Sequence, residues 1–126
     1  MTQHRTYKSI EDATMQELQL EIIRRSLHND FDGRHVYDYL ITHPELWTAV
    51  LLDRNDLIKL RDLPENIWNA DTLFILTPDA PSARRLAEIA EEVWIGMATV
   101  YTDPSSVDRE LGGAEEGQAI VSIWWD

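Results

Sequence analysis

Residues 81–94 carry an apolar residue on nearly every helical turn, and the charged residues between them fall on the opposite side. The apolar set is Ala83, Leu86, Ala87, Ala90, Val93 and Trp94. This spacing matches the period of about 3.6 residues of an amphipathic helix, so we predict a helix over 81–94 with one buried face. Three alanines on that face let the helix lie close against a sheet.

The segments on either side of this helix favour strands. Residues 73–76 form a short continuous apolar run, Leu-Phe-Ile-Leu, which is typical of a strand covered on both faces. Residues 95–101 are rich in strand-forming residues, and in residues 118–125 both alternating sets of side chains are mostly apolar. We therefore predict a small sheet of about three strands, crossed by the helix over 81–94.

The first half of the chain has helical patterns with short connections. We predict a helix over about 10–29, and a second helix after Asp32-Gly33 with Asp32 as its N-cap. The sequence THPE (42–45) has the spacing of a capping box with proline at the first helical position, which predicts a third helix. The buried face of that third helix is the stripe Leu46, Trp47, Val50 and Leu51.

Together these patterns predict an α+β fold in a single domain, residues 1–126. An N-terminal helical group, about 9–63, packs on a sheet-containing half, about 70–126. A chain of this length buries roughly two-thirds of the surface that it exposes when unfolded, which is enough for a core without disulfides. The alternative fold is a compact α/β layer in which every connection is a right-handed crossover.

Composition excludes several kinds of site. The chain contains no cysteine, which excludes disulfides, thiolate zinc sites and a cysteine nucleophile. No apolar run reaches the roughly eighteen residues of a membrane-spanning helix, and the start lacks the apolar core of a signal peptide. The serine-hydrolase and zinc-protease motifs G-x-S-x-G and H-E-x-x-H are absent. We expect a soluble, cytoplasmic protein that uses no cofactor and no membrane.

The charge of the chain is strongly acidic and uneven. The formal net charge is -12 at pH 7. Residues 1–63 contain 8 Lys and Arg against 11 Asp and Glu, whereas residues 64–126 contain 3 against 12, a net charge of -9. Such a surface repels phosphate backbones, which argues against direct nucleic-acid binding. It attracts a basic protein partner, although a net charge of this size also serves simple solubility.

Residues 28–43 hold three of the four histidines together with three aspartates, a density that raises the question of a metal or catalytic site. His35 and His43 fall on one side of the predicted second helix. Eight residues separate them, which corresponds to about 12 Å along a helix, too far for both imidazoles to reach one ion. We interpret the cluster as a solvated helix face with caps, and we predict no metal site.

Asp79 and Asp103 each follow a predicted strand. If those strands are parallel neighbours, both carboxylates lie at one edge of the sheet, where they could hold Mg²⁺ or act as an acid–base pair. The alternative is that each aspartate is a helix N-cap, because Pro81 and Pro104 follow at helix-start positions. We favour the caps. A small metal-assisted hydrolase that uses Asp79 and Asp103, with His35 or His43 as base, is kept as the alternative function.

Four of the five tryptophans bear on partners and core. Trp47 and Trp94 lie on apolar helical stripes, so we assign them to the core. Trp124 and Trp125 point to opposite faces of the last strand, which leaves one for a partner or for a homo-oligomer. Our leading hypothesis is a non-catalytic acidic protein-binding or regulatory domain, of which an inhibitor- or immunity-type protein is one concrete form. The binding residues that we predict are Trp124, Trp125, Glu115 and Glu116.

Overall fold

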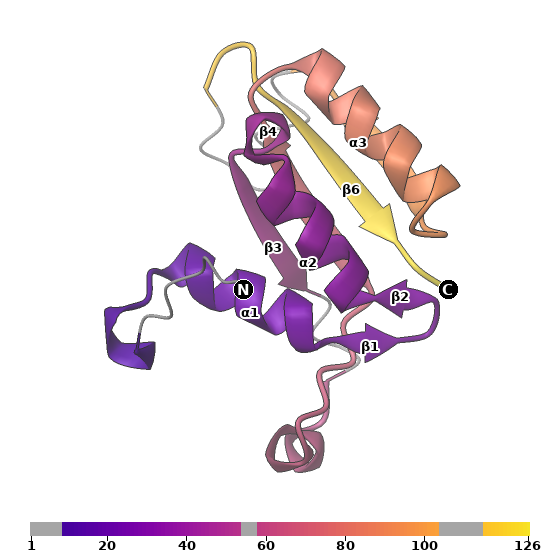
Figure 1. Ribbon diagram of the computed structural model, residues 1–126. Coiled ribbons are helices and arrows are strands. Elements are labelled where there is room, and N and C mark those ends of the chain that lie inside the picture. The colour runs from indigo at the N-terminus through magenta and orange to yellow at the C-terminus, as the bar shows by residue number, and fades with distance from the viewer. Residues whose placement is uncertain (1–8, 54–57, 104–114) are drawn as a thin grey trace.

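The computed structural model describes residues 9–53, 58–103 and 115–126. In these residues a four-stranded sheet is accompanied by three α-helices, and a two-stranded hairpin lies at one end (Figure 1). The α-helices are α1 (Met15–Arg25), α2 (Gly33–Thr42) and α3 (Ala80–Glu92). The strands are β1 (Leu27–His28), β2 (Phe31–Asp32), β3 (Ala49–Asp53), β4 (Thr72–Thr77), β5 (Met97–Tyr101) and β6 (Ala119–Trp124). Short 3-10 helices cover Ile10–Asp12, Pro44–Leu46 and Leu60–Glu65.

The larger sheet has the strand order β3-β4-β6-β5, and every neighbouring pair is antiparallel. β4 and β5 therefore run parallel to each other with β6 between them, and α3 connects them across β6. This arrangement confirms the predicted α+β fold with a crossing helix, and its antiparallel pairing excludes the alternative α/β layer. The end of β6 lies beside the start of β5, and the start of β6 lies beside the end of β4.

Helices α2 and α3 bury their apolar faces against the same face of the sheet. Alternate residues of three strands point into this core: Val50, Leu52, Leu73, Ile75, Val121 and Ile123. From α3, the small residues Ala83 and Ala90 are buried in the same core. Trp94 is 4% exposed, and Trp47 is half-buried against the same core, which confirms the core assignment of both. The core thus joins residues from both halves of the chain.

Helix α1 is shorter than the helix predicted over 10–29. A capping box sets its start, because Thr14 Oγ1 accepts from the Glu17 N–H at 3.0 Å and Glu17 Oε1 accepts from the Thr14 N–H at 2.9 Å. The helix ends at Arg25, since the chain then turns through the β1–β2 hairpin. Asn29 takes the left-handed conformation that this two-residue turn requires, with φ of 54°.

The third predicted helix is wrong beyond its first turn. Pro44–Leu46 forms a 3-10 helix, and Ala49–Asp53 is instead the edge strand β3, paired with β4. Val50 and Leu52 are buried, whereas Ala49, Leu51 and Asp53 are half-buried, which is the alternation of a strand. A short apolar run fits a helix and a strand equally well, and pairing with β4 decides between them. The sheet therefore has four strands rather than about three, one of them from the predicted helical group.

Two glutamines of α1 close the outer edge of β3. Gln16 Nε2 donates to the Val50 carbonyl at 3.0 Å, and Gln16 Oε1 accepts from the Val50 N–H at 2.8 Å. Gln19 Oε1 accepts from the Leu52 N–H at 3.2 Å. Open backbone groups on an edge strand promote pairing with other chains, and these side-chain amides occupy them.

We expect Gln16→Ala to lower the free energy of unfolding by about 2 kcal/mol, because two hydrogen bonds are lost and the edge groups of Val50 are left open. Gln19→Ala removes one hydrogen bond and is expected to cost about half as much. Urea denaturation gives both values, and light scattering should show more aggregation for the Gln16 variant. Equal costs for the two variants would contradict this account of the edge.

Candidate functional site

A polar cavity of about 170 Å³ lies where the β1–β2 hairpin, the first turn of α2 and the exit from α3 meet. Its lining residues are Asp30, Asp32, His35, Val36, Val93, Trp94 and Ile95. The Asp30 N–H donates to the Asp126 carbonyl at 3.2 Å, which ties the hairpin to the last residue. Figure 1 shows the hairpin, the C-terminus and the end of α3 at the same end of the molecule. We call this space the polar cavity.

The start of α2 positions two of the polar side chains. Asp32 Oδ1 accepts from the His35 N–H at 3.4 Å, which confirms Asp32 as the N-cap of α2. His43 follows the other end of α2, where its ring stacks on Tyr39 with a centroid separation of 4.0 Å. His43 Nδ1 lies 3.0 Å from the Tyr39 carbonyl. The structure therefore separates the two histidines, and His35 lines the cavity while His43 does not.

Trp94 lines the polar cavity from within the core. Its carbonyl accepts from Trp125 Nε1 at 2.7 Å, and its ring meets Tyr39 edge to face with centroids 5.6 Å apart. The indole N–H of Trp94 is buried, and no acceptor for it lies among residues 9–53, 58–103 and 115–126. A buried donor without an acceptor costs about 1–3 kcal/mol, so this indole N–H is an unfavourable element of the core.

Asp79 and Asp103 lie at the opposite end of the sheet, after the parallel strands β4 and β5. Because β6 separates those strands, they are about 10 Å apart. Asp79 Oδ1 accepts from the Ser82 N–H at 2.8 Å, which lowers the pKa of this exposed carboxyl and confirms Asp79 as the N-cap of α3. Neither aspartate lines the polar cavity. The short helix predicted after Asp103 lies outside the described residues.

The His, Asp and Glu side chains in the part of the chain that the structure describes are spread over the molecule rather than gathered around one point. No group of three or more His, Cys, Asp or Glu side chains is arranged there to hold a metal ion. Asp30, Asp32 and His35 share one cavity without forming a coordination set.

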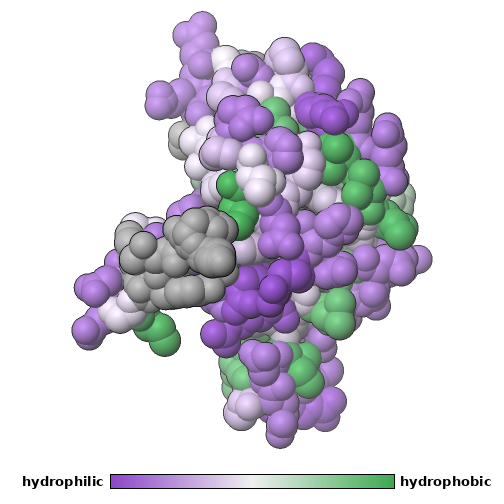
Figure 2. Space-filling model, in the orientation of Figure 1, coloured by the Kyte–Doolittle hydropathy of each residue, from purple (hydrophilic) through white to green (hydrophobic). Residues whose placement is uncertain are grey.

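Four large apolar side chains are exposed at the same end as the polar cavity. They are Val93 (44% exposed), Ile95 (67%), Met97 (61%) and Trp124 (40%), and we call them the C-terminal surface. The first three lie at the connection from α3 into β5, and Met97 is the register partner of Trp124 in the β5–β6 ladder. Figure 2 shows hydrophobic side chains exposed on the right side of the molecule, where α3 runs and ends.

The predicted binding residues are divided by the structure. Trp125 is fully buried, whereas Trp124 is exposed and its Nε1 donates to Asp71 Oδ2 at 3.1 Å. The alternation of the last strand therefore leaves one tryptophan at the surface, as predicted. Glu115 and Glu116 are exposed but precede the start of β6, at least about 17 Å from Trp124 along the strand. The two glutamates are not part of the C-terminal surface.

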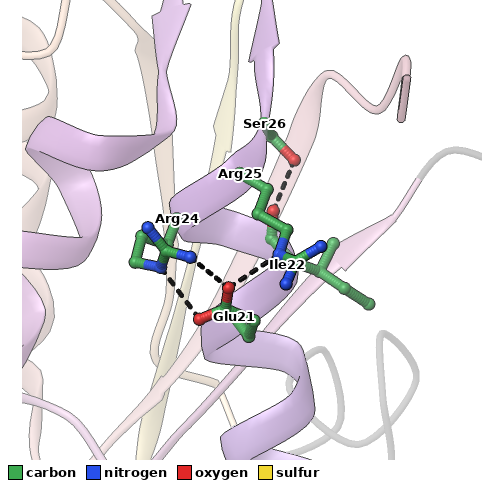
Figure 3. Close-up of polar contacts among 5 residues, drawn as sticks. All are labelled: Glu21, Ile22, Arg24, Arg25 and Ser26. Carbon is green, nitrogen blue, oxygen red and sulfur yellow. Dashed lines mark hydrogen bonds and ion pairs between the residues drawn. The ribbon is translucent and has the colours of Figure 1, made fainter. Parts of the chain in front are cut away.

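A second, apolar cavity of about 280 Å³ lies beside α1. Its lining residues are Ile22, Arg25, Leu63, Asn66, Ile67 and Trp68. Figure 3 shows that Arg24 and Arg25 both donate hydrogen bonds to the Glu21 carboxylate. The distance from Arg25 Nε to Glu21 Oε2 is 2.6 Å. Ser26 Oγ donates to the Ile22 carbonyl at 2.7 Å on the next turn. This ion-pair cluster closes the end of α1.

The cluster makes stability depend on pH. Hydrogen bonds from Arg24, and then from Arg25, lower the pKa of Glu21 from 4.5 to about 2. Because the folded pKa lies below the unfolded one, the stabilisation is present above pH 4.5 and is lost as the pH falls toward about 2. Glu21 is partly exposed, so solvent screening limits the effect to about 1 kcal/mol. We expect the free energy of unfolding, measured by urea denaturation, to fall less for Glu21→Gln than for wild type as the pH is lowered toward about 2.

Comparison with known proteins does not assign the site. The chain matches no family model, no curated protein and no solved structure. No helix in the described residues is long and apolar enough to cross a membrane.

Ile95 and Met97 were not among the binding residues predicted from the sequence, and no sequence pattern connected Trp94 with the hairpin. The signal present in the sequence was the apolar run 93–97 around one glycine, which exceeds what the end of an amphipathic helix needs. The cavity itself had no local signal, because its residues come from two segments about sixty positions apart.

Proposed function

We propose that this protein is a non-catalytic acidic domain that binds a basic protein partner through the C-terminal surface. The net charge of -12 favours a partner of opposite sign and steers its approach. Exposed carboxylates accompany the four apolar residues. Asp30 and Asp32 line the polar cavity together with Val93 and Ile95, Glu91 and Glu92 precede Val93 in the chain, and Asp126 follows Trp125. The fitting partner presents apolar side chains to the centre of the surface and Lys or Arg to its rim.

The observation that carries this proposal is the backbone of Ile95, whose φ is 59°. This left-handed conformation costs an ordinary residue roughly 1–2 kcal/mol, and glycine or asparagine ordinarily occupies it at the end of a helix. Both neighbours, Trp94 and Gly96, are buried, so the turn itself is fixed by the core. An exposed, β-branched residue here benefits neither the turn nor the core. A partner that covers Ile95 supplies a reason for it.

We expect Ile95→Gly to raise the free energy of unfolding by about 1 kcal/mol, because the strain at this position is relieved and little buried area is lost. The matched control is Val93→Gly. Val93 is also exposed and β-branched but has a φ of -116°, so glycine there should lower stability by about 0.5–1 kcal/mol. Chemical denaturation of both variants gives the sign of each change. If both variants are less stable than wild type, the backbone at Ile95 is not strained and no longer supports the proposed partner.

A second copy of the chain fits the surface less well than a basic partner does. Each copy brings a net charge of -12, so two acidic surfaces repel when they meet. The acidic charge favours one specific version of the proposed function, in which the protein covers the surface of a basic enzyme as an inhibitor or immunity protein does. Its association should weaken as salt rises, because exposed charges are screened within about 10 Å at 0.1 M salt.

The hydrolase alternative has weaker support. Asp79 and Asp103 are separated by β6, and the Asp79 carboxylate is engaged by the Ser82 N–H. His35 lies in the first turn of α2 and His43 follows its last residue, so the two histidines are not in one place. A catalytic carboxylate needs to be available to its substrate, so the engagement of Asp79 in its helix cap weakens this alternative.

Selection from a random displayed peptide library tests the proposed function. Wild-type protein should enrich peptides that combine Lys or Arg with an apolar residue, and their binding should weaken as salt rises. Met97→Ser and Trp124→Ser should each abolish most of this binding, while Ile10→Ser, which changes an exposed apolar residue in the short helix before α1, should not. Peptides without basic residues, or binding that survives both surface variants, would overturn the proposal. So would the absence of any enriched peptide.

A further inference from the structure

We propose that the basic partner binds as an extended segment, which adds a further strand to the sheet along the open edge of β5. This inference rests on the proposed function and names the form in which the partner must present its chain. Met97 belongs both to β5 and to the C-terminal surface, so a strand on this edge continues directly from that surface. In such an arrangement main-chain hydrogen bonds supply affinity, and alternate side chains supply specificity.

The two edge strands of the sheet differ in how their outer main-chain groups are occupied. β3 and β5 are the edges, and Gln16 and Gln19 occupy outer groups of β3. β5 has the sequence Met-Ala-Thr-Val-Tyr, with no charged residue and no proline, and its register with β6 is unbroken. Native proteins ordinarily protect an edge with charges, proline or a bulge, so β5 is the edge on which a further strand can pair.

The direction of the main-chain groups of β5 follows from its pairing with β6. The Ala98 N–H donates to Glu91 Oε2 at 3.2 Å, so it points away from β6. In an antiparallel pair, alternate residues direct both main-chain groups to the same side, and Val100 therefore has the same direction as Ala98. Among residues 9–53, 58–103 and 115–126, no group bonds to the Ala98 carbonyl or to the outward groups of Val100. These groups are available to a strand.

Glu91 makes this edge selective for a basic strand. Its carboxylate lies where the carbonyl of an added strand would accept from the Ala98 N–H. An added strand displaces this carboxylate, and a Lys or Arg on the strand then gives it a new partner. Glu92 follows at the end of α3, and both glutamates are exposed. An acidic strand would meet them with the same charge, so the edge favours a basic chain.

A second copy of the chain fits this edge less well. Two β5 strands related by a two-fold axis would pair antiparallel, which places the start of one strand beside the end of the other. Glu91 and Glu92 precede the start of β5, and Asp103 follows its end, so acidic residues of the two copies would meet. Like charges opposite each other across a strand pair are destabilising.

Titration of labelled wild-type protein with acetyl-Lys-Val-Thr-Val-Thr-Lys-amide tests the inference, with the amide N–H resonances of the sheet assigned. The resonances of Ala98 and Val100 should shift in a saturable way, whereas those of the alternate residues of β5, which donate to β6, should shift less. The outward amides of Val50 and Leu52 in β3, which glutamine oxygens already accept from, should stay in place. Alternation along β5 is the signature of strand addition, and binding by charge alone does not produce it.

Two control peptides separate strand pairing from charge. Acetyl-Lys-Pro-Thr-Pro-Thr-Lys-amide keeps the charge but lacks the N–H donors at its prolines, so it should give no alternating shift. Acetyl-Glu-Val-Thr-Val-Thr-Glu-amide keeps the strand-forming residues but reverses the charge, so it should bind several-fold more weakly than the lysine peptide.

Variants of the protein provide the matched comparison. Glu91→Gln keeps an oxygen that can accept from the Ala98 N–H but removes the charge, so the lysine peptide should bind about threefold more weakly. Glu65→Gln removes one exposed charge from the 3-10 helix Leu60–Glu65 and should leave binding unchanged. Val100→Pro removes an outward N–H and leaves the β6 ladder intact, and it should abolish the saturable shift at Ala98.

The outcomes separate this inference from the proposed function. If the β5 amides do not shift, or shift equally with the proline peptide, no strand adds to this edge and the inference falls. If the same resonances change with protein concentration alone, a second copy pairs with the edge, which also overturns the inference. If selected peptides need Met97 and Trp124 but give no alternating shift, the inference falls while the proposed function stands. If the lysine peptide adds to β5 but no basic peptide is enriched, the edge stands without the proposed function.

Discussion

Gly33→Ala is expected to destabilise the protein by about 3 kcal/mol or more, because a side chain there would collide with main-chain atoms. A Cβ at position 33 would lie 1.8 Å from the Ile23 carbonyl oxygen and 2.5 Å from that of Ser26. The Gly33 N–H also donates to the Ser26 carbonyl at 3.0 Å. The first residue of α2 therefore rests directly on the last turn of α1, and no rotamer change can make room. Urea denaturation measures the loss.

Gly117→Ala is the control for this variant. Gly117 has φ of 88° and nothing within 4 Å of an added Cβ, so alanine there costs only backbone strain, about 1–2 kcal/mol. If Gly33→Ala costs no more than Gly117→Ala, then α2 does not lie on α1 as described. The position of Asp32 and His35 at the polar cavity depends on that contact, so the result also bears on the candidate site.

Trp125→Ala should lower the free energy of unfolding by about 4 kcal/mol, within the range for large buried aromatic side chains. Trp125 is fully buried, its ring lies 4.4 Å from that of Phe31, and its Nε1 donates to the Trp94 carbonyl at 2.7 Å. Removal leaves a large cavity between the hairpin and the sheet and an open carbonyl on Trp94. Calorimetry or urea denaturation gives the size of the effect.

The neighbouring residue supplies the comparison. Trp124→Ala removes a partly exposed ring and one hydrogen bond to Asp71, so we expect a cost of about 1–2 kcal/mol. A one-residue slip of β6 would exchange the faces of these two tryptophans. If Trp124→Ala proves the more destabilising variant, the register of β6 against β4 and β5 is wrong, and so is the composition of the C-terminal surface.

Features governed by local chemistry were predictable from sequence. Asp32 and Asp79 were identified as N-caps because a short acidic side chain before a helical stripe has one common role, and both accept the expected N–H. The helix over 81–94 was recognised from its apolar period, although it ends at Glu92. Residues 73–76 were recognised as a buried strand because the run is short and is bounded by turn residues.

Features governed by long-range pairing were not predictable. Ala49–Asp53 resembles a helix in isolation and becomes a strand because β4 offers it a partner. The hypothesis of a shared site for Asp79 and Asp103 required their two strands to be neighbours in the sheet. The sequence contained no signal that β6 would lie between those strands. The left-handed backbone of Ile95 depends on how α3 ends against the core, which no local pattern encodes.

The affinity of the Ile95→Gly protein for a selected basic peptide, measured by titration calorimetry beside wild type, tests the central claim most directly. If the C-terminal surface binds a basic partner, this variant should be more stable than wild type yet bind the peptide about tenfold more weakly, since an apolar anchor is lost. Unchanged affinity for the peptide would contradict the claim, because Ile95 would then have no role at the surface.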